Sequence, residues 1–178
     1  MRLTGFWNEK RITTALLSYI IEGDTTPVLD TQVADAHMLN GISFNTGNAC
    51  DYTSASEGVK IIQILGYSMK AVALPKGGVL TFEFEVEKEG DYDISTMLIP
   101  TQPTDGDDLR YRVAVDDALP VSFSLKEPFR SEHWKDNVLS GQAVRHLRQH
   151  LQAGRHLLTI CAVDSHIVVD QWSLKMTD

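Results

Sequence analysis

The chain has 178 residues, of which 43% are hydrophobic and 22% are charged, and its net charge is -8. A chain of this length can bury a core without cross-links, and its negative charge argues against nucleic acid as a partner. Two cysteines are too few for a disulfide framework, and no apolar run is long enough to span a membrane.

Residues 1–39 differ from the rest of the chain. Apolar residues recur at helical spacing between Asn8 and Glu22, which predicts one amphipathic N-terminal helix capped by Asn8 and ended by Gly23. The apolar stripe of such a helix needs a surface to cover. We expect an arm that is a remnant of a preceding helical domain, a clasp onto the sandwich, or a loosely docked segment. No signal peptide is recognised, and the localisation stays open.

From residue 41 onward the apolar pattern has a period of two, which is typical of β-strands. Strong turn signals separate the runs, for example Pro75-Lys76-Gly77-Gly78. Residues 142–151 fit neither a strand nor a helix clearly. The predicted strands are 42–45, 59–65, 71–74, 79–86, 92–99, 109–115, 121–125, 157–163 and 167–174. Strands at this spacing predict an all-β fold for residues 40–178, an antiparallel β-sandwich of jelly-roll, galactose-binding-like type.

The carboxylates do not form a catalytic signature. Glycoside hydrolysis needs two carboxyl groups at a set separation across a cleft. Asp105, Asp107 and Asp108 cluster in a loop with a glycine, where aspartates are more often solvated turn formers. Ser131 has no evident base and acid partner. We therefore predict no catalytic residue in this chain.

Metal binding is a weaker alternative at two places. Asp51 and Asp170 are candidate ligands for a structural calcium, because this ion prefers carboxylate oxygens. The preferred interpretation of Asp170 is an aspartate with hydrogen-bond or ion-pair partners, because it follows an apolar strand. His146 and His150 are four residues apart and would share the face of a helix, but no third zinc ligand is evident.

Sugar binding needs a flat ring to stack on a pyranose and planar polar groups to hold the hydroxyls. The candidate ligand-binding residues are Tyr67, Gln102, Asp105, Arg110, Arg130 and Trp134. Arg130 could pair with Glu132 or with the carboxylate of a glucuronic acid. The alternative for the loop that starts after Pro128 is that Trp134 caps the core and Arg130 bridges locally. Trp172 is predicted to lie in the core.

Several segments occur in an order that resembles one family. They are Leu65-Gly66-Tyr67-Ser68, Pro100-Thr101-Gln102-Pro103, Phe129-Arg130-Ser131-Glu132 with Trp134, Leu151 to Gly154 with His156-Leu157, and Asp164 with Ile167-Val168-Val169-Asp170-Gln171. Together they resemble the C-terminal domain of glycoside hydrolase family 115, the xylan α-glucuronidases. The resemblance covers about residues 41–175. The family's catalytic machinery lies in larger upstream domains, which are not matched here.

The chain departs from the family pattern at four places. Val59 stands where a tryptophan is expected, Ile64 where a glycine is expected, and Cys161 where a lysine is expected. Asp116-Asp117-Ala118 replaces an Asp-Gly turn. If the missing tryptophan contacts sugar in the family, Val59 weakens the case for a sugar ligand.

The resemblance implies a non-catalytic accessory domain of an α-glucuronidase-like system, serving contacts between domains or subunits. The partner would be a second copy of the chain or a catalytic partner chain. The alternative is a carbohydrate-binding module for xylan-type oligosaccharides or polysaccharides. An isolated hydrolase is the third interpretation, and we expect no cofactor beyond the calcium considered above.

Overall fold

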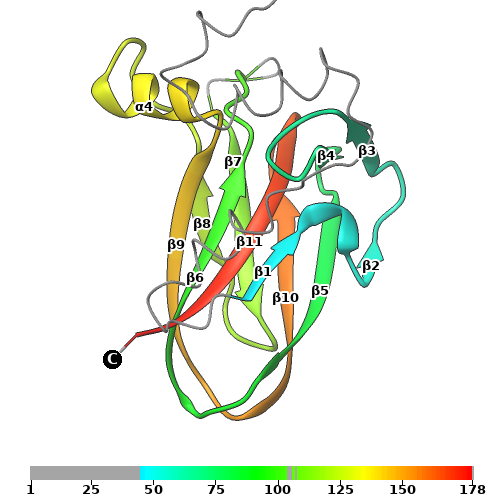
Figure 1. Cartoon of the computed structure of the whole chain (residues 1–178). Helices are drawn as coiled ribbons and strands as arrows, with labels where there is room; N and C mark the ends of the chain where they lie inside the picture. Colours follow the sequence, from blue (N-terminus) through cyan, green and yellow to red (C-terminus); the bar gives the residue numbers. More distant parts are fainter. Residues whose placement is uncertain (1–44, 104–105, 107, 178) are drawn as a thin grey trace, which may run out of the picture. The chain divides into compact units, whose positions relative to one another are not determined.

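The computed structural model describes residues 45–103, 106 and 108–177, which form two antiparallel β-sheets facing each other (Figure 1). The predicted helix at 8–22 and the predicted domain boundary near residue 40 lie outside the described residues. The elements are β1 Asn45–Asn48, the 3-10 helix η1 Ala49–Asp51, β2 Ser54–Ala55, β3 Lys60–Gln63, β4 Lys70–Leu74, β5 Val79–Val86, β6 Gly90–Leu98, β7 Arg110–Val115, β8 Val121–Ser124, α4 Glu132–Ser140, β9 Ala143–Leu151, β10 Gly154–Ala162 and β11 Ile167–Thr177.

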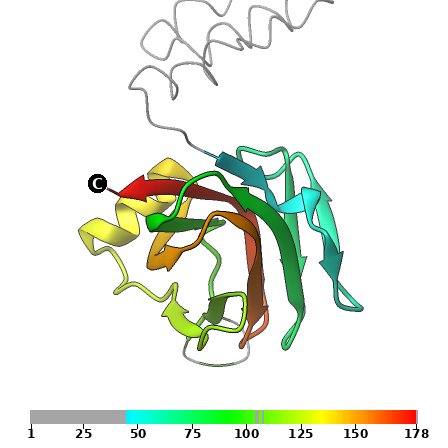
Figure 2. The ribbon, with the colours of Figure 1, turned by 90° about the horizontal axis from the view of Figure 1, so that it is seen from below.

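The first sheet has the order β3-β4-β11-β6-β9, and β1 also pairs with β11; the second has the order β2-β5-β10-β7-β8. Seen from below, α4 lies on the opposite side of the strands from β2 and β3 (Figure 2). Among the described residues, no helix is long and apolar enough to cross a membrane. The predicted all-β antiparallel sandwich is confirmed.

Strand β11 changes its neighbour halfway along its length. Residues Ile167 to Val169 pair with β4, whereas Gln171 to Leu174 pair with β1. On the other edge β11 pairs with β6 from Val169 onward, with an irregular register between Val169 and Gln171. Asp170 therefore lies at a bulge, at the point where the neighbour changes from β4 to β1.

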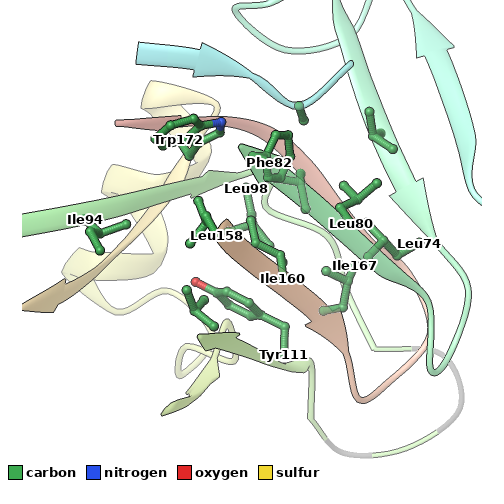
Figure 3. Packing of buried hydrophobic residues seen from close by; sticks show 14 of the residues in the cluster. Leu74, Leu80, Phe82, Ile94, Leu98, Tyr111, Leu158, Ile160, Ile167 and Trp172 are labelled. Carbon is green, nitrogen blue, oxygen red and sulfur yellow. The ribbon is translucent and has the colours of Figure 1, made fainter. Parts of the chain in front are cut away.

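The core fills the space between the two sheets, because alternate residues of each strand point inward. Leu80 and Phe82 of β5, Leu158 and Ile160 of β10 and Trp172 of β11 meet there (Figure 3). The Trp172 ring lies 5.8 Å from that of Phe82, which confirms its predicted core position. The core also contains one buried polar pair, because the hydroxyl groups of Thr96 and Tyr111 are 2.7 Å apart. Burial raises the pKa of Tyr111 far above its usual range.

Two segments differ from the predictions. Residues 143–151 form strand β9, so the ambiguous segment is not a helix and His146 and His150 do not share a helix face. Residues 132–140 form helix α4, which the sequence analysis treated as part of a loop. Cys161 is half-buried with a free thiol. The strand expected at 42–45 lies mostly outside the described residues, and β1 begins at Asn45.

Candidate functional site

The loop between β3 and β4 is held against the buried side chain of Asp170. This carboxylate is fully buried. It accepts hydrogen bonds from the backbone N–H of Tyr67 (2.8 Å), from the backbone N–H and hydroxyl of Ser68 (3.0 and 2.6 Å), and from the Gln142 side-chain amide (2.9 Å). Both carboxylate oxygens therefore face donors. Asp170 thus has the hydrogen-bond partners that the preferred interpretation of the sequence analysis requires.

Gly66 lets this loop approach β11 closely. Its φ is +77°, and a Cβ atom built there would lie 2.2 Å from Oδ1 of Asp170. A side chain at this position would thus meet both a strained backbone and the carboxylate. The loop carries the ring of Tyr67 outward, with 65% of the residue exposed. The Tyr67 hydroxyl donates to the carbonyl of Ser140 over 2.8 Å, which ties the loop to the end of α4.

Helix α4 has a capping residue at each end. The Ser131 hydroxyl accepts from the backbone N–H of Trp134, and Gly141 ends the helix in the left-handed conformation. Before the cap, the guanidinium of Arg130 lies 5.2 Å from the centre of the Phe129 ring. That ring meets Trp134 edge-on at 5.3 Å. Phe129 is 74% exposed, whereas Trp134 is half-buried.

Arg130 does not pair with Glu132, which was one of the two partners considered for it. Glu132 instead accepts from Lys135 one turn along the helix, over 2.6 Å. Arg130 has φ at +63°, and its guanidinium lies over the Phe129 ring. Within the described residues its guanidinium has no ion-pair partner.

Arg110 is committed to an ion pair. Its Nε and Nη2 atoms donate to Asp164 over 2.8 and 3.0 Å, and its backbone N–H donates to the same carboxylate. Hydrogen bonding to Arg110 lowers the pKa of Asp164 to about 2. Gln102 is exposed in the loop between β6 and β7, and Asp105 lies outside the described residues. The six candidate sugar residues therefore do not form one described cluster.

The histidines of β9 face carboxylates on β6. Nδ1 of His146 lies 3.0 Å from Asp93, and Nδ1 of His150 lies 2.8 Å from Asp91. In the part of the chain that the structure describes, no three His, Cys, Asp or Glu side chains are grouped as metal ligands. Asp51, the last residue of η1, accepts a hydrogen bond from the side chain of Asn48 at the end of β1. Calcium at Asp51 or Asp170 remains a prediction.

The surface feature missed by the sequence analysis is apolar. Five of the exposed large hydrophobic residues lie between positions 61 and 69, and three more lie between 129 and 139. They are Ile61, Ile62, Ile64, Tyr67, Met69, Phe129, Val138 and Leu139. We call this set the apolar surface. Its two parts are joined by the hydrogen bond between Tyr67 and Ser140.

One sequence signal did point to this surface, namely Ile64 at a position where the family pattern has glycine. Its φ is +60°, a conformation that glycine adopts without strain. Val59, in place of the expected tryptophan, is half-buried and packs against the core.

Comparison with known proteins agrees with the resemblance. The sequence profile described as "Glycosyl hydrolase family 115 C-terminal domain" matches residues 29–178. No curated protein matches the chain. A solved 4-O-methyl-α-glucuronidase of family 115, BtGH115A, with specificity for decorated arabinogalactans, is 33% identical over 75% of this chain, with a TM-score of 0.69. The chain covers 18% of that protein's length.

Carbohydrate-binding modules share the fold. A family 35 module from Clostridium thermocellum is 15% identical, with a TM-score of 0.55 over 74% of this chain and 97% of its own. The C-terminal family 6 module of the laminarinase LamC from Zobellia galactanivorans is 10% identical, with a TM-score of 0.56 over 75% and 99%. The fold is thus that of jelly-roll modules, and the profile match over most of the chain shows that it belongs to the glycosyl hydrolase family 115 C-terminal domain family.

Proposed function

We propose that this chain is a non-catalytic accessory domain that docks onto the protein part of an α-glucuronidase-type system. The observation that carries the proposal is the set of exposed apolar side chains on β3, on the loop after it and around α4, of which the loop and the helix are linked by the hydrogen bond from Tyr67 to Ser140. Exposed apolar patches of this kind are typical of protein contact sites.

Two of the candidate sugar residues support protein docking over sugar binding. The Nε and Nη2 edge of the Arg110 guanidinium is paired with Asp164, so this edge is not free for the carboxylate of a sugar acid. The Tyr67 hydroxyl donates its hydrogen to Ser140, so it can offer a sugar hydroxyl only an acceptor. The ring of Tyr67 remains exposed as an apolar contact.

The chemistry of the described carboxylates also favours an accessory role. A glycosidase acid needs a raised pKa so that it holds its proton near neutral pH. Glu89 and Asp164 show the opposite direction. Hydrogen bonds to Gln152 and His150 lower the pKa of Glu89, and the bond to Arg110 lowers that of Asp164.

The partner that fits is the larger polypeptide of a family 115 enzyme, because the domain covers only 18% of the solved relative. The test is calorimetric titration of the purified chain into BtGH115A from which its own C-terminal domain is deleted. Intact BtGH115A is the control, because we expect its own matching domain to hold the place where this chain would dock. We expect saturable binding to the deleted form alone. Absence of binding at a chain concentration of about 100 µM, which is 100-fold above a micromolar Kd, would overturn the proposal.

Carbohydrate binding is the second candidate, and the cluster of Arg130, Phe129 and Trp134 favours it. This cluster offers an exposed ring for stacking and a guanidinium for a uronic acid. Titration with glucuronoxylan and arabinogalactan oligosaccharides, followed by tryptophan fluorescence, tests it. Phe129→Ala should abolish binding, while Leu119→Ala, an exposed change on the turn after β7, should not. Sugar binding without binding to the deleted enzyme would make the second candidate the function.

A further inference from the structure

We infer that β3 and the loop after it form a docking edge, to which an extended, acidic and apolar segment of the partner polypeptide adds as a new strand. This inference rests on the proposed function and deepens it, because it says where the partner binds and what its chemistry is. Strand addition to a free sheet edge is a common way to bind an extended segment.

Among the described strands, β3 lies at the edge of its sheet and pairs with β4 only, in the register Ile61 with Val72 and Ile62 with Ala71. Successive side chains of a strand point to opposite faces, so Ile61 and Ile62 lie on different faces. Both are nevertheless exposed, as is every residue of β3. An apolar edge that is left open in this way is what proteins normally avoid unless a partner covers it.

The loop after β3 holds two apolar side chains in strained backbone. Ile64 has φ at +60° and is 81% exposed, and Met69 has φ at +57° and is 54% exposed. The N–H of Ile64 donates to the carbonyl of Met69 over 2.8 Å, so the two residues close the loop together. A β-branched side chain in the left-handed region is costly, and exposure gives no packing in return. Strain of this kind concentrates at functional positions.

The charge of the docking edge favours an acidic segment over a second copy of the chain as its partner. Residues 58–76 contain three lysines and no acidic residue, in a chain with a net charge of -8. Lys60 and Lys70 lie at opposite ends of the β3–β4 pair, because Lys60 is opposite Ala73 and Lys70 is opposite Gln63. A two-fold contact of this edge with a second copy would place two lysine-bearing edges without acidic residues against each other. A partner segment with apolar residues between acidic ones complements the edge, so we assign that chemistry to the occupant.

The docking edge is also pre-organised. Asp170 anchors Tyr67 and Ser68 by three hydrogen bonds, so the loop does not have to be ordered on binding. A site that is ordered before the partner arrives loses less conformational entropy on binding.

The experiment titrates three variants and the native chain into BtGH115A lacking its C-terminal domain. Ile64→Asn removes the apolar anchor and places a residue that tolerates left-handed backbone. Lys60→Glu combined with Lys70→Glu reverses the charge of the edge. Leu119→Asn is the matched control, since Leu119 is 90% exposed on the turn after β7. Amide hydrogen exchange at residues 60–63 is measured with and without the partner.

We expect Ile64→Asn to weaken binding at least tenfold while raising Tm, a combination that a merely structural role would not produce. The double lysine variant should weaken binding at least fivefold, and Leu119→Asn should leave it unchanged. The amides of β3 should gain protection. Native binding that Ile64→Asn leaves unchanged, without protection at β3, would overturn this inference and leave the proposed function standing. Absence of binding by the native chain would overturn both. Self-association lost in Ile64→Asn would overturn the choice of partner.

Discussion

Replacement of Asp170 tests how strongly the stability of the fold depends on the buried carboxylate that holds the loop between β3 and β4. Asp170→Ala removes the acceptor for four donors, two of which are the backbone N–H groups of Tyr67 and Ser68. The side chains of Ser68 and Gln142 can turn toward water, whereas the backbone groups cannot. Each buried donor left without a partner costs about 1–3 kcal/mol.

The two backbone donors are only part-buried, so the low end of this range applies, and Asp170→Ala should lower the free energy of unfolding by about 2 kcal/mol. For a domain of this size, this loss corresponds to a fall in Tm of about 8 °C. Asp170→Asn keeps the volume and one acceptor oxygen, but turns an amide donor toward the loop, so it should cost about half as much.

Urea denaturation at pH 7 measures these differences, with Asp164→Asn as the control. Asp164 pairs with Arg110 near the surface, where an ion pair contributes about 1 kcal/mol or less. Hydrogen exchange should show faster exchange at Tyr67 and Ser68 in Asp170→Ala. A loss below about 1 kcal/mol in Asp170→Ala, or an equal loss in the control, would refute the reasoning.

Three further changes test other parts of the structure. Gly66→Ala should lower the free energy of unfolding by about 2–4 kcal/mol, because the φ of Gly66 is +77° and the new Cβ would meet Asp170. An unchanged midpoint of urea denaturation would contradict this close approach. Ile64→Asn should stabilise it by about 1 kcal/mol, because left-handed strain is relieved; a lower midpoint would show that Ile64 packs. Burial lowers the pKa of His156, but hydrogen bonds to Asp116 and to the Gln152 carbonyl raise it, and the net direction is upward. Protonated His156 therefore stabilises the fold fully below about pH 6.5, and this contribution is lost as the pH rises through the raised pKa. The urea midpoint of the native chain should fall between pH 6 and pH 9 more than that of His156→Gln, and equal slopes would count against the assignment.

The strands could be predicted where one face of the sheet is buried and the other is exposed to solvent. The alternation of Leu80, Phe82 and Val86 with Thr81 and Glu83 gave the bounds of β5 correctly. Strand β9 was harder, because polar and charged side chains occupy many of its positions. Helix α4 has no buried residue, so it carries no apolar period to detect. Its caps Ser131 and Gly141 were the only signal.

The site could be predicted in part only, because its contacts join distant segments. The sequence indicated that Asp170 needs a partner if buried, and the structure confirms the burial. The donors lie on a loop about a hundred residues away, a pairing that no local pattern specifies. Arg110 and Asp164 are a similar case, since the sequence analysis assigned Arg110 to a ligand and not to Asp164. The departure at Ile64 was visible, but its meaning required the backbone angle.

The change of neighbour along β11 has a consequence for the order in which the chain folds. Within the described part of the chain, strands β1, β4 and β6 are joined into one sheet only through β11, which follows all of them in the chain. Each of these pairings closes a long loop, so the sheet is completed by contacts of high sequence separation. Such topologies fold slowly, in milliseconds to seconds. Until β11 arrives, the edges of β4 and β6 remain open, and this is the interval in which aggregation competes with folding.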